Sequence, residues 1–565
     1  MRLVNRRDTG VAFALVAVLG ILGVAVAMPA FRPAAVPPPV PTETPDLGHV
    51  QGVLGRPSSI TPLTARTQVD RDLVALLFRG LVRLGPGNAI LPDLADRWTV
   101  SEKGSRWTFH MRTDAVWHDG VPVTSRDVVY TVNVLHDPGY LGPLAAAWAQ
   151  IQATALDAQT VQFDLADPVG GFLQAAVLPL LPAHILSGVP VATLADDPFA
   201  REPLGNGAFA LVEITADRAV LEPVLPPAKG AVDPLGDPVT GEIATRTPRL
   251  PSLELRFYDT AEELAAAFAS GQVASVGDLP PAAAIDLATS TPGARAIRYP
   301  STTLTALAFN LRGVGGPFAD ARTRQALVAA IDRSDLVADL LGGAGTRSAT
   351  PIPPSSWAFD PKAAPEVAYD RGAASKGLRE AGWRRENKAW IPPQAAKPLK
   401  ITILAPDAAA NAIAHNAATR VAAAWTSLGL ATTVEALAPG ELVSRLGAAD
   451  FTVAVIDINM GLDPDPYPIL ASSQARAGGA NISGIQDAAL DKALVAARAP
   501  SAAATRMKAY SALQKLLGTL QPMPTLFFRD TVLVAGPGLD GPVARPIADP
   551  GGRFWDVVRW ATVGR

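Results

Sequence analysis

Apolar and polar positions follow two different periods along this chain. One run places leucines at helical spacing, at positions 73, 76, 77 and 81. Residues 107–112 (WTFHMR) instead alternate apolar and polar side chains, which is typical of a half-buried strand. Helical and strand patterns keep alternating past residue 46, and no repeat of about 20 to 50 residues interrupts them. The chain is therefore predicted to be α/β.

An uncharged run from Val11 to Met28 follows the arginines at positions 2, 6 and 7. As a helix it would span about 27 Å, close to the ~30 Å hydrocarbon core of a membrane. The preceding positive charge predicts an internal N-terminus and an exported, extracytoplasmic body. Two interpretations stay open for residues 1–28: Ala25-Val26-Ala27 fits a cleaved signal peptide, whereas the length of the run fits an uncleaved anchor through residues 11–28. The Pro-rich residues 29–45 predict an extended linker.

Composition excludes several classes of protein. A length of 565 residues predicts two or three domains, and a net charge of −3 gives no basic surface for nucleic acid. The absence of cysteine removes disulfides, thiolate metal sites, thiol nucleophiles and a lipid-bearing cysteine. The six histidines show no metal-ligand spacing, and no nucleophile elbow or phosphate loop is present. We therefore expect no catalytic residues, no metal and no cofactor.

A series of motifs points to one family. They are the helix, turn and strand order of 72–132, the glycine turn 203–209 (PLGNGAF), the strand 305–310 (TALAFN), the helix 322–333 with RTRQAL and AIDR, the Tyr-Asp and Ala-Gly-Trp of 369–383, and the helix 419–430. In this order they resemble the extracellular solute-binding proteins of family 5, which serve peptide and nickel importers of the ABC type. The resemblance covers roughly residues 50–565.

The resemblance implies a periplasmic-binding-protein-like class II fold, with two main lobes, an inserted third domain and a ligand cleft between the lobes. It also implies domain boundaries: domain I from residues 46–82, 205–302 and 528–565, domain II from 83–204, and domain III from 303–527. The Pro/Gly-rich stretch 223–251 departs from the family pattern and is predicted to be an insertion or a lengthened loop.

Acidic residues are the first candidates for ligand contact. Asp457 and the cluster of Asp463, Asp465 and Tyr467 stand where peptide-binding relatives place an acid against the ligand's ammonium group. A carboxylate in a closing cleft of low dielectric would hold a cation more firmly than in water. The Asp-Pro-Asp-Pro sequence is equally typical of a surface turn, so both interpretations stay open.

Four further residues complete the candidate ligand set. Trp425 forms either an apolar cleft wall or part of the core. His415 and Asn416 stand where dipeptide receptors of the family carry an arginine for the ligand carboxylate, which argues against a free dipeptide. Asn310 ends the strand of the family motif at 305–310 and is the last candidate for ligand contact.

The function that the resemblance implies is solute capture for an ABC importer. The chain, as a monomer, would bind a small peptide or a similar solute outside the membrane by hinge closure. It would deliver that solute to a permease powered by a separate ATPase. The alternative is a membrane-anchored receptor on the same scaffold that signals or scavenges without an importer, held through its N-terminal segment.

Overall fold

The computed structural model describes residues 48–142, 144–224, 248–313, 316–476, 478–500 and 502–563. The predicted signal peptide or anchor, the linker and most of the stretch 223–251 lie outside these residues. Within the described ranges, no helix has the length and apolar character needed to cross a membrane.

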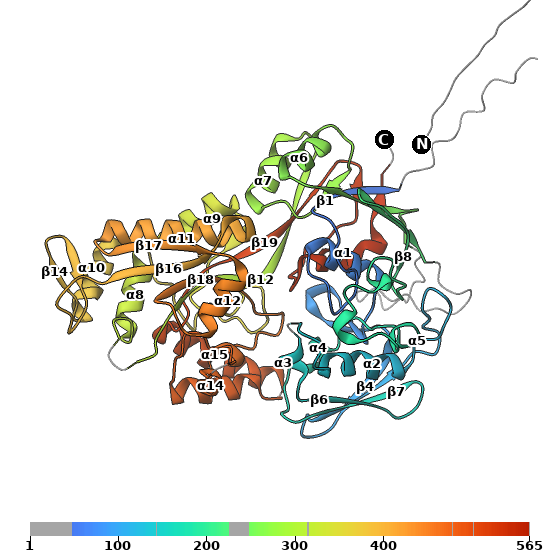
Figure 1. The fold of residues 1–565 in the computed structure, drawn as a ribbon, viewed down its shortest axis with the longest axis horizontal. Coiled ribbons are helices and arrows are strands. Elements are labelled where there is room, and N and C mark those ends of the chain that lie inside the picture. The colour runs from blue at the N-terminus through green and yellow to red at the C-terminus, as the bar shows by residue number, and fades with distance from the viewer. Residues whose placement is uncertain are drawn as a thin grey trace, which may run out of the picture. The chain divides into compact units, whose positions relative to one another are not determined.

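Eleven strands form one mixed sheet that runs through two lobes (Figure 1). Its order is β17-β16-β18-β12-β19-β11-β1-β10-β9-β8, with β13 paired to β19. The strands are β1 (His49–Leu54), β8 (Phe209–Ile214), β9 (Arg218–Pro223), β10 (Leu253–Tyr258), β11 (Ser275–Val276), β12 (Arg295–Phe309), β13 (Gly345–Thr346), β16 (Lys400–Pro406), β17 (Ala431–Leu437), β18 (Val453–Asn459) and β19 (Thr525–Ala535). β1 pairs in parallel with β10 and β11, whereas β12 is antiparallel to both of its neighbours.

The long strands β12 and β19 belong to both lobes. Their pairing shifts register between Pro300 and Leu304, so the ladder is interrupted near its middle. On one side of the shift, Tyr299 joins the core around α1. On the other side, Leu307 and Phe527 join a second core. Two separate cores connected by one pair of strands give a two-lobed molecule, as the sequence predicts.

The first lobe packs helices on the β1 side of the sheet. These are α1 (Gln68–Leu77), α6 (Ala261–Ala269), α7 (Pro281–Ser290) and the 3₁₀ helix η5 (Pro550–Arg559). Thr67 and Asp70 form a reciprocal capping box that starts α1. The α6 and α7 helices cover β1, β11 and β19 with a small apolar core of their own. A two-stranded ladder joins β20 (Leu539–Asp540) to β21 (Ala561–Thr562).

A four-stranded antiparallel sheet lies within the segment predicted as domain II. Its strands, in spatial order, are β4 (Ala95–Val100), β5 (Arg106–Met111), β7 (Thr160–Leu165) and β6 (Ile151–Ala155). The alternating pattern of residues 107–112 therefore forms a strand, as predicted. The other elements of this segment are β2 (Val82–Leu84), η1 (Pro86–Asn88), β3 (Ile90–Pro92), α2 (Ser125–His136), α3 (Ala145–Trp148), α4 (Phe172–Ala175), α5 (Ala183–Leu186), η2 (Val191–Thr193) and η3 (Pro198–Ala200).

The second lobe surrounds strands β16 to β18 with helices. They are α8 (Ala321–Ala329), α9 (Arg333–Leu341), α10 (Arg371–Glu380), α11 (Ala408–Leu428), α12 (Pro439–Gly447), α13 (Tyr467–Leu470), η4 (Ser472–Gln474), α14 (Ala488–Arg498) and α15 (Ala503–Leu520). A small hairpin joins β14 (Arg384–Glu386) to β15 (Ala389–Ile391). The long helix α11 packs on β16, β17 and β18. It begins with a break at Asn411, whose backbone is not helical.

The buried His49 makes the stability of the first lobe depend on pH. Its Nε2 lies 2.7 Å from the Ser275 hydroxyl, and burial lowers its pKa to about 4. As the pH falls, the unfolded chain therefore protonates this histidine near pH 6.5, whereas the folded chain protonates it only near pH 4. Relative to His49→Gln, the wild type should lose up to about 3 kcal/mol of unfolding free energy as pH falls from 6.5 to 4. Urea unfolding of both proteins at several pH values across that range measures this loss. The same pH dependence of the unfolding free energy in both proteins would contradict the low pKa of His49.

Candidate functional site

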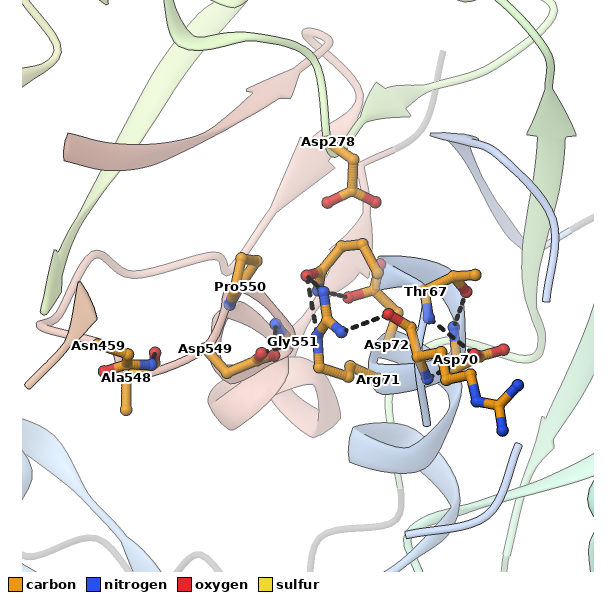
Figure 2. Close-up of polar contacts among 12 residues, drawn as sticks. Thr67, Asp70, Arg71, Asp72, Asp278, Asn459, Ala548, Asp549, Pro550 and Gly551 are labelled. Carbon is orange, nitrogen blue, oxygen red and sulfur yellow. Dashed lines mark hydrogen bonds and ion pairs between the residues drawn. The ribbon is translucent and has the colours of Figure 1, made fainter. Parts of the chain in front are cut away.

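The two lobes meet beside the crossing strands. Where the β12 ladder is interrupted, the Thr302 N–H donates to the Ile547 carbonyl over 3.1 Å. The Thr302 hydroxyl donates to Asn459 Oδ1 over 2.7 Å. Asn459 Nδ2 donates to the Ala548 carbonyl over 2.5 Å, and both of these residues are labelled in Figure 2. The last bond joins the end of β18 in the second lobe to the C-terminal part of the first. It marks the boundary between the lobes.

A buried arginine organises the first-lobe side of this boundary. Arg553 on η5 donates through Nη1 to Asp72 Oδ1 over 2.7 Å and through Nη2 to Asp72 Oδ2. Asp278 Oδ1 lies 3.5 Å from Nη1, and both Arg553 and Asp72 are fully buried. Since Asp72 belongs to α1, the pair ties the start of the lobe to its C-terminal end.

If all three side chains of this cluster were ionised, negative charge would be in excess, because two carboxylates face one guanidinium. Burial would lower the pKa of Arg553, but Asp278 and Asp72 raise it overall. Burial raises the pKa of Asp278 well above its usual range, and the nearby Asp72 adds to that rise. Asp278 therefore holds a proton at pH values where an exposed aspartate is ionised. The cluster then carries one negative and one positive charge, which is what a dry interior tolerates.

Asp549 directly follows Ala548, whose carbonyl accepts the hydrogen bond from Asn459 between the lobes. Its Oδ1 accepts the Gly551 N–H over 2.8 Å, which caps η5, and its Oδ2 lies 2.9 Å from Arg71 Nε. Both side chains of this ion pair are about two-fifths exposed. Asp70, one residue before Arg71, accepts hydrogen bonds from four backbone N–H groups and so fixes the loop after β1; the donors are Ser58, Ser59, Arg66 and Thr67.

Asp457 lies on β18, on the second-lobe side of the boundary, and both of its carboxylate oxygens accept hydrogen bonds. Its Oδ2 accepts from Arg529 Nη1 over 2.7 Å and from Asn411 Nδ2 over 2.8 Å. Its Oδ1 accepts from the Thr305 hydroxyl over 2.7 Å. The Asn411 contact explains the break in α11, because the Asn411 side chain leaves the helix to reach Asp457 while its Oδ1 caps the following turn at Ala414. Asp457 thus joins three elements of the second lobe.

The acids of the Asp-Pro-Asp-Pro turn are also paired. Asp463 accepts two hydrogen bonds from Arg506, of 2.8 and 2.7 Å, and both side chains are nearly buried. Asp465 lies 3.1 Å from Arg498 Nη2, and the Arg498 guanidinium stacks 4.4 Å from the Tyr467 ring centre. Every acid predicted as a ligand contact therefore has an arginine partner in this structure.

Three of the remaining predicted ligand residues form contacts within the second lobe, and the fourth, Asn416, is exposed. Trp425 is fully buried, its Nε1 donates to the Leu327 carbonyl over 3.0 Å, and it stacks with Phe309 in the core. Of its two interpretations, the structure therefore favours the core. Asn310 Nδ2 donates to two carbonyls of the 449–451 turn. His415 bonds the Pro406 carbonyl through Nδ1, and Asn416 is exposed on α11.

The sequence interpretation missed Arg498, Arg529 and Asn459, which no motif marked. Arg506 belongs to the family pattern of the closing helices, but nothing in that pattern identified it as the partner of Asp463. The described residues contain no group of three or more histidine or acidic side chains arranged to hold a metal.

The mixed sheet shared by two lobes, together with the likeness to solved structures of binding proteins, gives the chain the class II fold of periplasmic solute-binding proteins. The chain belongs to the bacterial extracellular solute-binding proteins of family 5, because the model "Bacterial extracellular solute-binding proteins, family 5 Middle" matches residues 89–481. The family prediction from the motifs is confirmed.

Individual relatives agree with this assignment. The oligopeptide-binding protein AppA of Bacillus subtilis is 23% identical over 520 residues, covering 90% of this chain and 91% of AppA. The periplasmic murein peptide-binding protein MppA of Escherichia coli is 27% identical over 532 residues, covering 88% and 90%. The crystal structure of NikZ from Campylobacter jejuni with Ni(L-His) superposes with a TM-score of 0.71, at 22% identity and covering 92% and 100% of the chains. That likeness establishes the fold.

Breaking the buried arginine cluster should be costly. Arg553→Met leaves Asp72 without its partner in a dry interior, so the unfolding free energy should fall by about 3–5 kcal/mol. Asp278→Asn is the matched control: burial raises the pKa of Asp278 and so favours its neutral form, and asparagine accepts the positive φ of this position, so it should cost much less. Chemical denaturation measures both, and equal losses in the two variants would contradict the proton on Asp278.

Proposed function

We propose that the chain captures a small solute, in the first place a peptide, between its two lobes outside the cytoplasmic membrane. As a monomer it would close on the solute and present it to an ABC permease that a separate ATPase drives. The observation that carries this proposal is the pair of continuous strands β12 and β19, since their interrupted ladder joins two independently packed lobes. Such a connection lets the lobes rotate without unfolding either core.

The relatives support a peptide as the solute. AppA is named for oligopeptides and MppA for a murein peptide, whereas NikZ was crystallised with a nickel–histidine complex. The domain division into 46–82, 205–302 and 528–565, with 83–204 inserted and 303–527 as the other lobe, remains part of the proposal.

The paired acids bear on how a solute would be held. Asp457, Asp463 and Asp465 each have an arginine partner, so each pair adds no net charge to the surface between the lobes. A ligand ammonium at Asp457 would compete with Arg529 for Oδ2. We therefore propose that affinity comes mainly from enclosed apolar surface and backbone hydrogen bonds. Selection would then act on peptide length more than on side-chain charge.

A second candidate function is a membrane-anchored receptor without an importer. The uncharged run 11–28 and the absence of a cysteine for lipid attachment favour it. Deletion of the gene decides between the two: loss of peptide uptake supports the importer component, and unchanged uptake with a lost response to peptides supports the receptor.

Native mass spectrometry of the full-length protein from its own host tests the proposal. Peptides of mixed sequence and similar length should co-purify with it. At about 100 times Kd, a bound peptide should raise the unfolding free energy by about 2.7 kcal/mol. A single non-peptide mass would overturn the peptide assignment while keeping solute capture. An empty protein that gains no thermal stability from a peptide library would contradict solute capture of this kind.

A further inference from the structure

A second contact joins the lobes through segments other than the crossing strands. The Gly170 N–H, in the segment predicted as domain II, donates to the Arg498 carbonyl at the end of α14 over 3.0 Å. Gly104 of the same segment abuts Pro500, since a Cβ at Gly104 would lie 2.9 Å from the proline Cβ. Figure 1 shows the α3–α4 end of this segment facing α14 and α15. This part of the first lobe thus reaches the second lobe independently of β12 and β19.

The surface that receives Gly170 is built from the paired acids. We call it the platform: Asp463 with Arg506, and Asp465 with Arg498. The Arg506 guanidinium is fixed by its two bonds to Asp463 and by stacking 4.7 Å from the Trp357 ring centre. Two positive and two negative groups leave the platform with no net charge. The platform is therefore a rigid surface of no net charge, against which Gly170 and Gly171 pack.

The glycines at 170 and 171 let the backbone approach this platform closely. A Cβ at Gly170 would lie 2.9 Å from Arg506 Cζ and Nε, and a Cβ at Gly171 would lie 2.9 Å from Asp463 Oδ2. Arg506 cannot easily move aside, because its pairing and stacking hold it nearly buried. The φ of Gly171 is −90°, which any residue adopts. Glycine is therefore required here for close approach and not for backbone freedom.

We propose that Gly170-Gly171 and the platform form a latch that stabilises the closed arrangement of the lobes. The latch rests on the proposed function, because it sets the equilibrium on which solute capture would act. Rotation about β12 and β19 separates the platform from the diglycine while both lobes stay intact. Each contact of the latch favours the closed state before any ligand arrives, so a ligand has less free energy to supply. The Asp-Pro-Asp-Pro acids then act in closure and not in recognition of a ligand ammonium.

Two-colour energy transfer on the full-length, ligand-free protein tests the latch. The chain has no cysteine, so Leu156→Cys and Val495→Cys give one dye on each side of the contact. Both positions are more than half exposed. Into this background we introduce Gly170→Val and, separately, Gly171→Val. The matched control is Gly188→Val in the same segment, where a Cβ meets nothing within 4 Å.

The ratio of closed to open molecules should fall about tenfold in Gly170→Val and Gly171→Val, as expected when one side chain is forced into a packed contact. It should stay at the wild-type value in Gly188→Val. A wild-type protein with no closed population, or an unchanged ratio in both latch variants, would overturn the latch. Equal thermal unfolding of all variants establishes that they fold. No peptide enters this measurement, so a failure to bind peptides overturns the proposed function without altering the result on the latch.

Discussion

The pairing of β12 with β19 is the constraint on which the rest of this structure depends. Both strands run without a break through two hydrophobic cores, and the register of their ladder shifts between Pro300 and Leu304 and again between Thr305 and Ala306. Covalent continuity keeps the lobes together, while the interruption leaves few hydrogen bonds to resist rotation at that point. The neighbouring contacts of Thr302 with Ile547 and Asn459 then define where the lobes meet.

Arginine–aspartate pairs fix the surfaces on either side of that crossing. Arg553 ties α1 to the C-terminal end of the first lobe, and Arg529 holds Asp457 against α11 and β12 in the second. Buried pairs of this kind add little net stability, yet removing one partner is costly. Their effect is to hold the elements beside the crossing rigidly together with little net charge. A rigid, neutral pair of surfaces suits a protein whose lobes must separate and meet repeatedly.

The fold was predictable from the sequence to a larger extent than the site. Periodicity gave the α/β class and the strand at 107–112, and the ordered motifs gave the family and the two lobes. The predicted ligand residues were chosen by type and position, which says nothing of partners far away in the chain. Asp463 is paired with a residue 43 positions away, and Asp457 with one 72 positions away. Trp425 was ambiguous for a related reason, since helical spacing alone does not separate a core face from a cleft wall.

Solute capture by closure of the two lobes is the central claim, and small-angle X-ray scattering tests it most directly. The full-length protein is measured empty and again with the peptide pool that it binds. We predict a smaller radius of gyration when the pool is bound, because the solute selects the closed arrangement. Bound peptides that leave the scattering curve unchanged would contradict closure about β12 and β19.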